Sequence, residues 1–123
     1  MNHQIIADRN TSLSIEDLAE LRENLHEQRL FRQEQLQQIA GAATVRTDAR
    51  LDRQAASQIE VRVKLAASAR MVLADVDAAL TRVDQGRYGA CQLCRKPIAR
   101  DRLMIVPQAR YCARCQQVRE AGR

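Results

Sequence analysis

Four cysteines have the clearest chemistry in this sequence, and they occur as two pairs. Each pair has two residues between its members, and 17 residues separate Cys91 and Cys94 from Cys112 and Cys115. A Cys-x-x-Cys pair presents two sulfur atoms from one tight loop, and four thiolates complete the tetrahedral shell that Zn²⁺ prefers. The spacing therefore predicts one structural Zn²⁺ with no coordination position left open for catalysis.

Two disulfides, or a redox-active Cys-x-x-Cys, are the alternatives to zinc. Disulfides need an oxidising compartment, but the N-terminus lacks the basic segment, the apolar segment and the cleavage site of an export signal. A redox-active pair needs no second copy. Iron–sulfur ligation is geometrically possible but has no other support in the sequence. We therefore predict zinc, and the reducing cytoplasm as the compartment.

Groups that could perform other catalysis are few. The histidines are His3, in a predicted tail, and His26, between Glu23 and Glu27 on a predicted helix. The sequence shows no set of nucleophile, base and orienting group. We interpret His26 as a solvated helix residue and predict a protein that is not an enzyme.

The elements that must position the zinc are expected to be long helices. The chain has three aromatic residues, both prolines lie in its last third, and the rest is rich in Ala, Leu, Gln, Glu and Arg. This composition is typical of long helices. No stretch approaches the roughly 20 apolar residues that span a bilayer, so no membrane segment is expected.

A first helix is predicted from about residue 15 to about residue 40, after a tail over residues 1–12. Ser14 is placed as its N-cap and Asp17 at the third helical position, which forms a capping box. Leucine and isoleucine then recur at three- and four-residue steps on one face. Gly41 supplies the expected stop.

A second helix is predicted from about Asp52 to about Gln85, after a tip region over residues 42–52. It ends before Gly86, a helix-terminating residue. Two helices with a short connection should form a long antiparallel coiled-coil hairpin over residues 13–86. The predicted seam positions of the second helix are Ile59, Ala66, Leu73 and Leu80 on one row and Ala55, Ala69, Val76 and Val83 on the other.

Polar residues interrupt this seam. Gln28 and Arg32 occupy seam positions of the first helix, and Arg62 interrupts the second. Polar seam residues commonly fix the alignment of two helices. We predict that Arg62 does so near Glu27 or Glu34.

The charge is uneven along the chain. Lys plus Arg minus Asp plus Glu gives −3 for residues 1–45, +1 for 46–86 and +7 for 87–123, the last becoming +5 with four thiolates and Zn²⁺. A basic module attracts either phosphates or an acidic protein surface. Direct nucleic-acid binding is therefore a second functional hypothesis. The candidate contact residues are Arg87, Arg95, Lys96, Arg100, Arg102, Arg110 and Arg114.

The last third also carries a recognisable pattern, formed by Tyr88, Gly89, the four cysteines, Pro97, Ile98, Arg102, Leu103 and Pro107. In these residues the chain resembles the zinc finger of the DksA/TraR family of bacterial transcription regulators. The helical hairpin fits the larger, DksA-like members, so the resemblance extends over residues 13–118. We therefore predict a mainly α protein with a zinc-finger module at residues 87–118 and a tail at 119–123.

The resemblance also implies a function. Such a factor binds RNA polymerase directly, without sequence-specific DNA binding, and is expected to be a monomer. Its coiled coil enters the secondary channel, and its tip alters open-complex stability near the active site, often together with the nucleotide ppGpp. A transcript-cleavage factor, whose tip acids recruit a second Mg²⁺, is an alternative within the same site.

The tip and the first cysteine loop depart from the family pattern. The family tip commonly reads Asp-x-x-Asp-x-Ala, where this chain has Ala49-Arg-Leu-Asp52-Arg-Gln-Ala55, with Asp48 one place early. Asp52 carries over as a tip residue and Asp48 is a second candidate, although Asp52 also fits a helix N-cap. Arg95 replaces the usual Gly of the cysteine loop, and a positive φ there would cost about 1 kcal/mol.

Overall fold

The computed structural model describes residues 13–45 and 53–122. These segments contain four helices and no β-strand; one isolated antiparallel bridge joins Ala90 to Pro97. The helices are α2 (Ile15–Val45), α3 (Arg53–Asp84), α4 (Arg100–Ile105) and α5 (Ala113–Ala121). The predicted mainly α fold is confirmed. None of the described helices is both long enough and apolar enough to cross a membrane.

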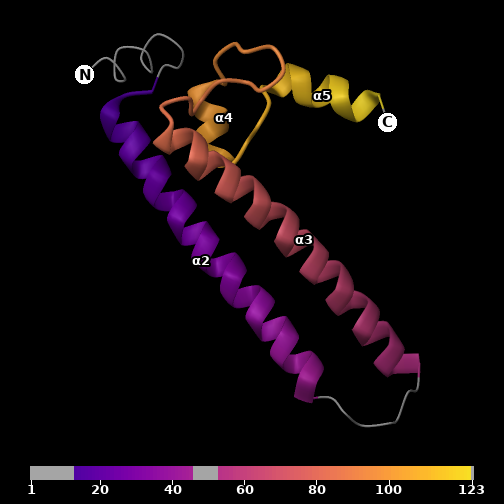
Figure 1. The fold of residues 1–123 in the computed structure, drawn as a ribbon. Helices are drawn as coiled ribbons and strands as arrows, with labels where there is room; N and C mark the ends of the chain where they lie inside the picture. Colours follow the sequence, from indigo (N-terminus) through magenta and orange to yellow (C-terminus); the bar gives the residue numbers. More distant parts are fainter. Residues whose placement is uncertain (1–12, 46–52, 123) are drawn as a thin grey trace.

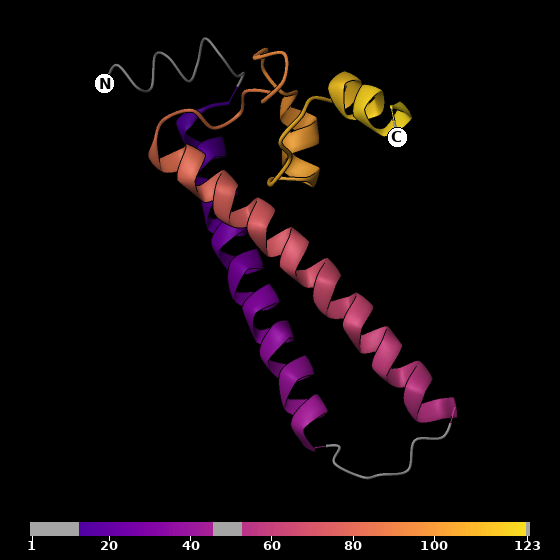
Figure 2. The ribbon, with the colours of Figure 1, turned by 45° about the vertical axis from the view of Figure 1, so that its right-hand side comes forward.

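Helices α2 and α3 form the predicted hairpin. They run side by side in opposite directions, with the finger at the end where α2 begins and α3 ends (Figures 1 and 2). Two ion pairs join the helices, Arg22 to Asp84 at 3.7 Å and Arg29 to Asp77 at 2.9 Å. In both pairs the residue numbers add up to 106, so residue i of α2 faces about residue 106 − i of α3.

This register contradicts the predicted role of Arg62. It places Arg62 opposite about residue 44, more than two helical turns from the levels of Glu34 and Glu27. Within the described part of the chain, neither glutamate forms an ion pair with Arg62. The prediction was wrong because the register is set at the other end, where the ion pairs and the apolar core lie.

The core lies at the base of the hairpin, where the two helices meet the finger. Helix α2 contributes Leu21 and Leu25, both essentially inaccessible to solvent. The buried residues that pack with them are Leu13, Val76, Ala79, Leu80, Tyr88, Cys91, Ile98, Leu103 and Ala109. Hairpin and finger therefore share one core.

The start of α2 confirms the predicted capping box. The backbone N–H of Asp17 donates to Ser14 Oγ at 3.0 Å, and the backbone N–H of Ser14 donates to Asp17 Oδ2 at 3.2 Å. Two donors that an α-helix otherwise leaves unpaired are satisfied in this way. The side chain of Leu13 is buried in front of the cap and fixes the entry of the chain into the base.

The predicted stop at Gly41 was wrong, because α2 continues through it to Val45. Glycine ends a helix when it takes a positive φ, and among described glycines only Gly86 and Gly89 do so. At Gly41 a glycine inside the helix costs only about 1 kcal/mol relative to alanine. The predicted tip over residues 42–52 therefore begins too early, and residues 46–52 lie outside the described segments.

The end of α3 is terminated as predicted by Gly86, which has a φ of 73°. The N–H of Gly86 donates to the Val83 carbonyl at 3.1 Å, and the N–H of Arg87 donates to the Arg82 carbonyl at 2.9 Å. These two bonds form a Schellman motif, which satisfies the last carbonyls and turns the chain into the finger.

Candidate metal centre

The four cysteine sulfurs lie together in the finger. Their potential ligand atoms are all within 4.8 Å of one another, and Cys94 Sγ is 3.9 Å from Cys112 Sγ. Zn–S bonds of about 2.3 Å in a tetrahedron place sulfurs roughly 3.8 Å apart. The arrangement of Cys91, Cys94, Cys112 and Cys115 therefore fits one Zn²⁺.

The first pair of cysteines is held in a tight loop over residues 91–96. The N–H of Cys91 donates to the Lys96 carbonyl at 2.8 Å, and the N–H of Arg95 donates to the Cys91 carbonyl at 2.9 Å. Closing this loop requires a left-handed residue, and Arg95 has a φ of 68°. The positive φ expected at this position is confirmed, although the residue is not glycine.

The second pair is built into the start of α5. Cys112 is the N-cap of this helix, and its sulfur accepts the backbone N–H of Cys115 at 3.4 Å. The backbone N–H of Gln92 donates to the Arg110 carbonyl at 2.8 Å and so joins the two cysteine loops. A short helix with no buried residue is thus tied to the metal centre by its first turn.

The electrostatics of the thiols favour a cation at their centre. Burial opposes ionisation of Cys91, but backbone N–H groups, that of Cys94 foremost, lower its pKa to about 6. The N–H of Cys115 likewise lowers the pKa of Cys112. Burial and the neighbouring thiols raise the pKa of Cys115 to about 12. Because like charges oppose ionisation of all four, a bound Zn²⁺ is what allows four thiolates here.

Contacts to α3 fix the finger on the hairpin. Arg110 Nε lies 2.7 Å from Asp75 Oδ1 on α3, and within the finger the hydroxyl of Tyr88 donates to the Pro107 carbonyl at 2.9 Å. The buried Arg82 reaches across from α3 and donates to the Ala109 carbonyl at 3.3 Å. Burial, with Arg110 nearby, lowers the pKa of Arg82. Polar contacts as well as the shared core therefore set the position of the finger.

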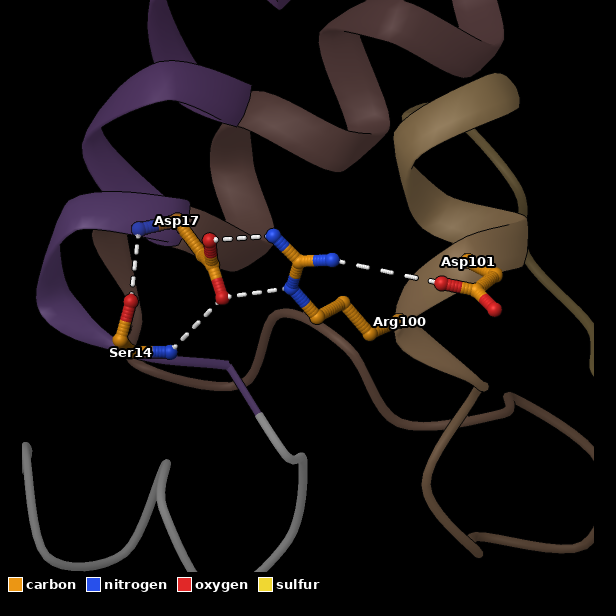
Figure 3. A network of polar contacts seen from close by, with 4 residues as sticks. All are labelled: Ser14, Asp17, Arg100 and Asp101. Atoms are coloured by element: carbon orange, nitrogen blue, oxygen red, sulfur yellow. Dashed lines mark hydrogen bonds and ion pairs between the residues drawn. The ribbon is translucent and has the colours of Figure 1, made fainter.

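A further contact links the finger to α2 (Figure 3). Arg100, the first residue of α4, donates from Nε and Nη2 to the two carboxylate oxygens of Asp17 at 2.8 and 2.9 Å. The Arg100 guanidinium, and then the cap of Ser14, hold the pKa of Asp17 well below its usual range. One carboxylate thus caps α2 and receives a bidentate guanidinium from 83 residues away.

The comparisons with known proteins agree with this geometry. The family described as "Prokaryotic dksA/traR C4-type zinc finger" matches residues 86–121. The transcription factor DksA2 from Pseudomonas aeruginosa has a solved structure that is similar to this chain, with a TM-score of 0.74 and 25% identity. The match covers 87% of this chain and 85% of that one. The fold of the chain is therefore DksA-like.

One curated relative is similar over a shorter region. An uncharacterized protein of Aquifex aeolicus (strain VF5) is 40% identical over 52 residues, which cover 41% of the DksA-like chain and 36% of that protein. The match thus spans about a third of the relative's length.

The basic candidates from the sequence divide into two groups in the DksA-like fold. Arg87 bonds to Gln85, Arg100 to Asp17, Arg102 to the Tyr111 carbonyl and Arg110 to Asp75. By contrast, Arg95, Lys96 and Arg114 are exposed and have no side-chain partner among the described residues. The sequence alone assigned all of them to one candidate contact surface. Hydrogen bonds and ion pairs that form only in the folded protein leave no local sequence pattern that would separate the two groups.

The predicted tip residues of the DksA-like chain cannot be placed on this site. Asp48 and Asp52 lie outside the described residues. Their roles rest on the family resemblance.

Proposed function

We propose that this DksA-like chain is a transcription regulator that binds RNA polymerase directly, in the cytoplasm. Its hairpin enters the secondary channel of the polymerase, and its tip changes the stability of the open complex from near the active site. The single observation that supports this proposal most is the likeness to the transcription factor DksA2 over 87% of the chain. That likeness includes the hairpin as well as the zinc finger.

The shape of the molecule suits this role. Helices α2 and α3 have 31 and 32 residues, which correspond to about 45–50 Å at roughly 1.5 Å per residue. The finger widens the base, whereas the hairpin is only two helices wide along its length (Figure 1). A narrow rod with a wide base enters a channel to a depth that the base determines.

The zinc centre has a structural part in this proposal. Its four protein ligands leave no open coordination position, so the metal holds the finger and is not a reaction centre. The bidentate contact between Arg100 and Asp17 then transmits the position of the finger to α2. The function we propose is accordingly not that of an enzyme.

A competition experiment tests where the chain binds. We expect the purified zinc-loaded protein to bind core RNA polymerase and to be displaced by another factor that occupies the secondary channel. Binding that is unaffected by such a competitor would place the site elsewhere on the polymerase. No binding to the polymerase at all would refute the proposed function.

A pair of matched variants tests the tip. We expect Asp52→Asn to weaken the effect on open-complex lifetime more than it weakens polymerase binding, because Asp52 matches the family's tip motif. Asp48→Asn removes the same charge four residues earlier in the sequence and should have the smaller effect. An unchanged effect of Asp52→Asn would reduce this residue to a helix cap. Repeating the assay with ppGpp tests whether the nucleotide is a co-effector.

Assays on backtracked complexes examine the alternative activity. If the tip acids recruit a second Mg²⁺, the complex with polymerase should cleave backtracked RNA, and Asp52→Asn should abolish the cleavage. We expect no cleavage above that of polymerase alone.

A further inference from the structure

We propose that the outer end of the zinc finger is a second contact surface, which binds an acidic surface of a protein partner. We call it the knuckle face and define it by Leu93, Arg95, Lys96 and Arg114. Its partner, if the proposed function is right, is RNA polymerase itself. The proposal adds a contact at the opposite end of the molecule from the tip.

The partners of the basic residues distinguish this face from the rest of the finger. Residues 87–123 contain nine Lys and Arg. Arg87, Arg100, Arg102 and Arg110 hold the fold through hydrogen bonds, and Arg119 stacks on the ring of Tyr111 at 4.7 Å. The three described cations that have no such use are those of the knuckle face. Contacts that stabilise the fold therefore explain the other described cations of the finger, but they do not explain Arg95, Lys96 and Arg114.

The segments that carry the three cations lie close to one another because the metal site gathers them. Arg95 and Lys96 directly follow Cys94, and Arg114 stands two residues after Cys112. The sulfurs of those two cysteines are 3.9 Å apart. Figures 1 and 2 both show the loop before α4 beside the start of α5, at the far end from the hairpin connection. The face is thus directed away from the shared core.

Backbone strain at Arg95 supports a functional role. Its φ of 68° is a conformation that glycine adopts without strain and that other residues rarely take. The side chain of Arg95 is exposed and makes no contact that would stabilise the finger. The cysteine loop requires this conformation but not an arginine, and backbone strain is often found at functional sites.

The composition of the face favours a protein over a nucleic acid. Leu93 is 51% exposed and lies in the same loop as Arg95 and Lys96. An apolar side chain among arginines is typical of protein interfaces. Binding of single strands, by contrast, relies on stacking aromatics. Tyr88 is buried, and the ring of Tyr111 is already covered by Arg119.

Neutralisation of the metal centre is the competing explanation of these cations. Four thiolates and one Zn²⁺ carry a net charge of −2, and nearby cations would offset it. The acidic residues of the finger, Asp101 on α4 and Glu120 on α5, lie outside the cysteine loops. Zinc retention therefore has to be measured together with partner binding.

Three changes test the knuckle face in the zinc-loaded, full-length chain, with core RNA polymerase as the probe. We expect Lys96→Gln with Arg114→Gln to weaken binding about tenfold at low salt, the difference disappearing at high salt. Leu93→Ala should weaken binding about fivefold at both salt concentrations. Arg95→Gly should weaken binding about threefold but raise the midpoint of thermal unfolding, because it relieves the strained backbone. Arg87→Gln removes one positive charge elsewhere in the finger and should change binding less than twofold.

The outcomes separate this proposal from the proposed function. If the wild-type protein binds polymerase and is displaced by a secondary-channel factor, but the variants bind equally well, the knuckle face is refuted and the proposed function stands. If the wild-type protein does not bind polymerase, both fail.

Three further measurements can also overturn the proposal. Zinc loss that parallels the loss of binding would reduce the cations to neutralisation of the metal centre. Salt-dependent binding of duplex DNA alone, lost in the double variant but not in Arg87→Gln, would assign the face to nucleic acid. Salt-dependent dimers of the chain alone, lost in the same variant, would assign it to a second copy.

Discussion

The two ends of the hairpin are stabilised very differently. At the base, Leu21, Leu25 and Val76 are almost completely buried, and the finger adds Leu103 to the same core. Residues 26–41 form the part of α2 that lies farther from the finger. None of these residues, whose side chains the structure describes, is buried. Nearer the tip on α3, Ile59 is 45% exposed although it occupies a predicted seam position.

The sequence of the seam explains this difference. The base seam of α2 is leucine, whereas Gln28 and Arg32 continue it toward the tip. Farther toward the tip, at about the level of residues 37–40 of α2, α3 offers the small side chains of Ala66 and Ala69, which are buried but contribute little apolar area. The molecule therefore concentrates its stability at the metal end. The end that acts on the polymerase, according to our proposal, depends on the base for its position.

Removal of zinc should destabilise the base of the hairpin more than any other change. Binding of structural zinc contributes about 10–16 kcal/mol in zinc-finger peptides. Without it α5 loses the link to the other cysteine loop, and the finger no longer holds Tyr88, Ile98 and Leu103 in the base core. We expect about one zinc per chain by metal analysis, and a large loss of helical circular dichroism on chelation. A metal-free protein that keeps its fold with four reduced thiols would contradict the structural role of zinc.

Two leucine-to-alanine variants compare the ends directly. Leu103 is fully buried in the shared core, so Leu103→Ala should lower the free energy of unfolding by about 3 kcal/mol. Leu30, on α2 beyond the base core, is 63% exposed. Leu30→Ala should therefore change the free energy of unfolding by less than about 0.5 kcal/mol. Denaturant unfolding of the zinc-loaded proteins measures both. Equal costs would mean that the two ends are equally well packed.

The cap of α2 should have an intermediate effect. Ser14→Ala removes the hydroxyl that accepts the N–H of Asp17, which should cost about 1 kcal/mol. Asp17→Asn removes the charge that pairs with Arg100 and should loosen the finger on α2 as well. Unfolding measurements of both variants, with hydrogen exchange in the finger, distinguish loss of the cap from loss of the contact.

The pH dependence of the Asp17 contact has a definite sign. Because the folded protein lowers the pKa of Asp17, its contribution to stability is complete above the unfolded pKa of about 4. The contribution is lost as the pH falls from there toward the lower folded value. The wild type should therefore lose stability in this window relative to Asp17→Asn, while zinc release affects both proteins alike. If the free energy of unfolding depends on pH in the same way in both proteins, the ion pair between Asp17 and Arg100 does not contribute to stability.

Local patterns were sufficient for much of this molecule. The four cysteines, the capping box of Ser14 and Asp17, and the stop at Gly86 each depend on residues close in sequence. The structure brings the sulfurs together, forms both cap hydrogen bonds and places Gly86 in a helix-terminating motif. Such features could be predicted because their physical causes act over a few residues.

Features that depend on the fold as a whole could not be predicted in this way. The contact between Arg100 and Asp17 joins residues 83 positions apart and has no sequence signal. The wrong partners for Arg62 followed from a register assumed without the base ion pairs. The wrong stop at Gly41 followed from treating a glycine as a helix end where the surrounding helix tolerates it.

The smallest predicted effect concerns the polar seam itself. Gln28 lies on the seam of α2, partly buried, and among the described residues its amide donates only to Asn24 Oδ1 on the same helix. Gln28→Leu should therefore raise the free energy of unfolding by about 0.5–1 kcal/mol, since it adds apolar area between the helices. Gln37→Leu places the same side chain on an exposed position of α2 and should have no such effect. The denaturant midpoints of the two variants, compared with that of the wild type, measure this difference.

A gain for Gln28→Leu alone would show that the seam beyond the base is weak because of its polar residues, and not because the helices are too far apart to pack. The loosely packed half would then be a property of a few side chains, which substitution can reverse while the metal end is left unchanged. Equal midpoints for both variants would instead mean that apolar area added at position 28 does not reach α3. The difference between the two ends would then lie in the path of the helices.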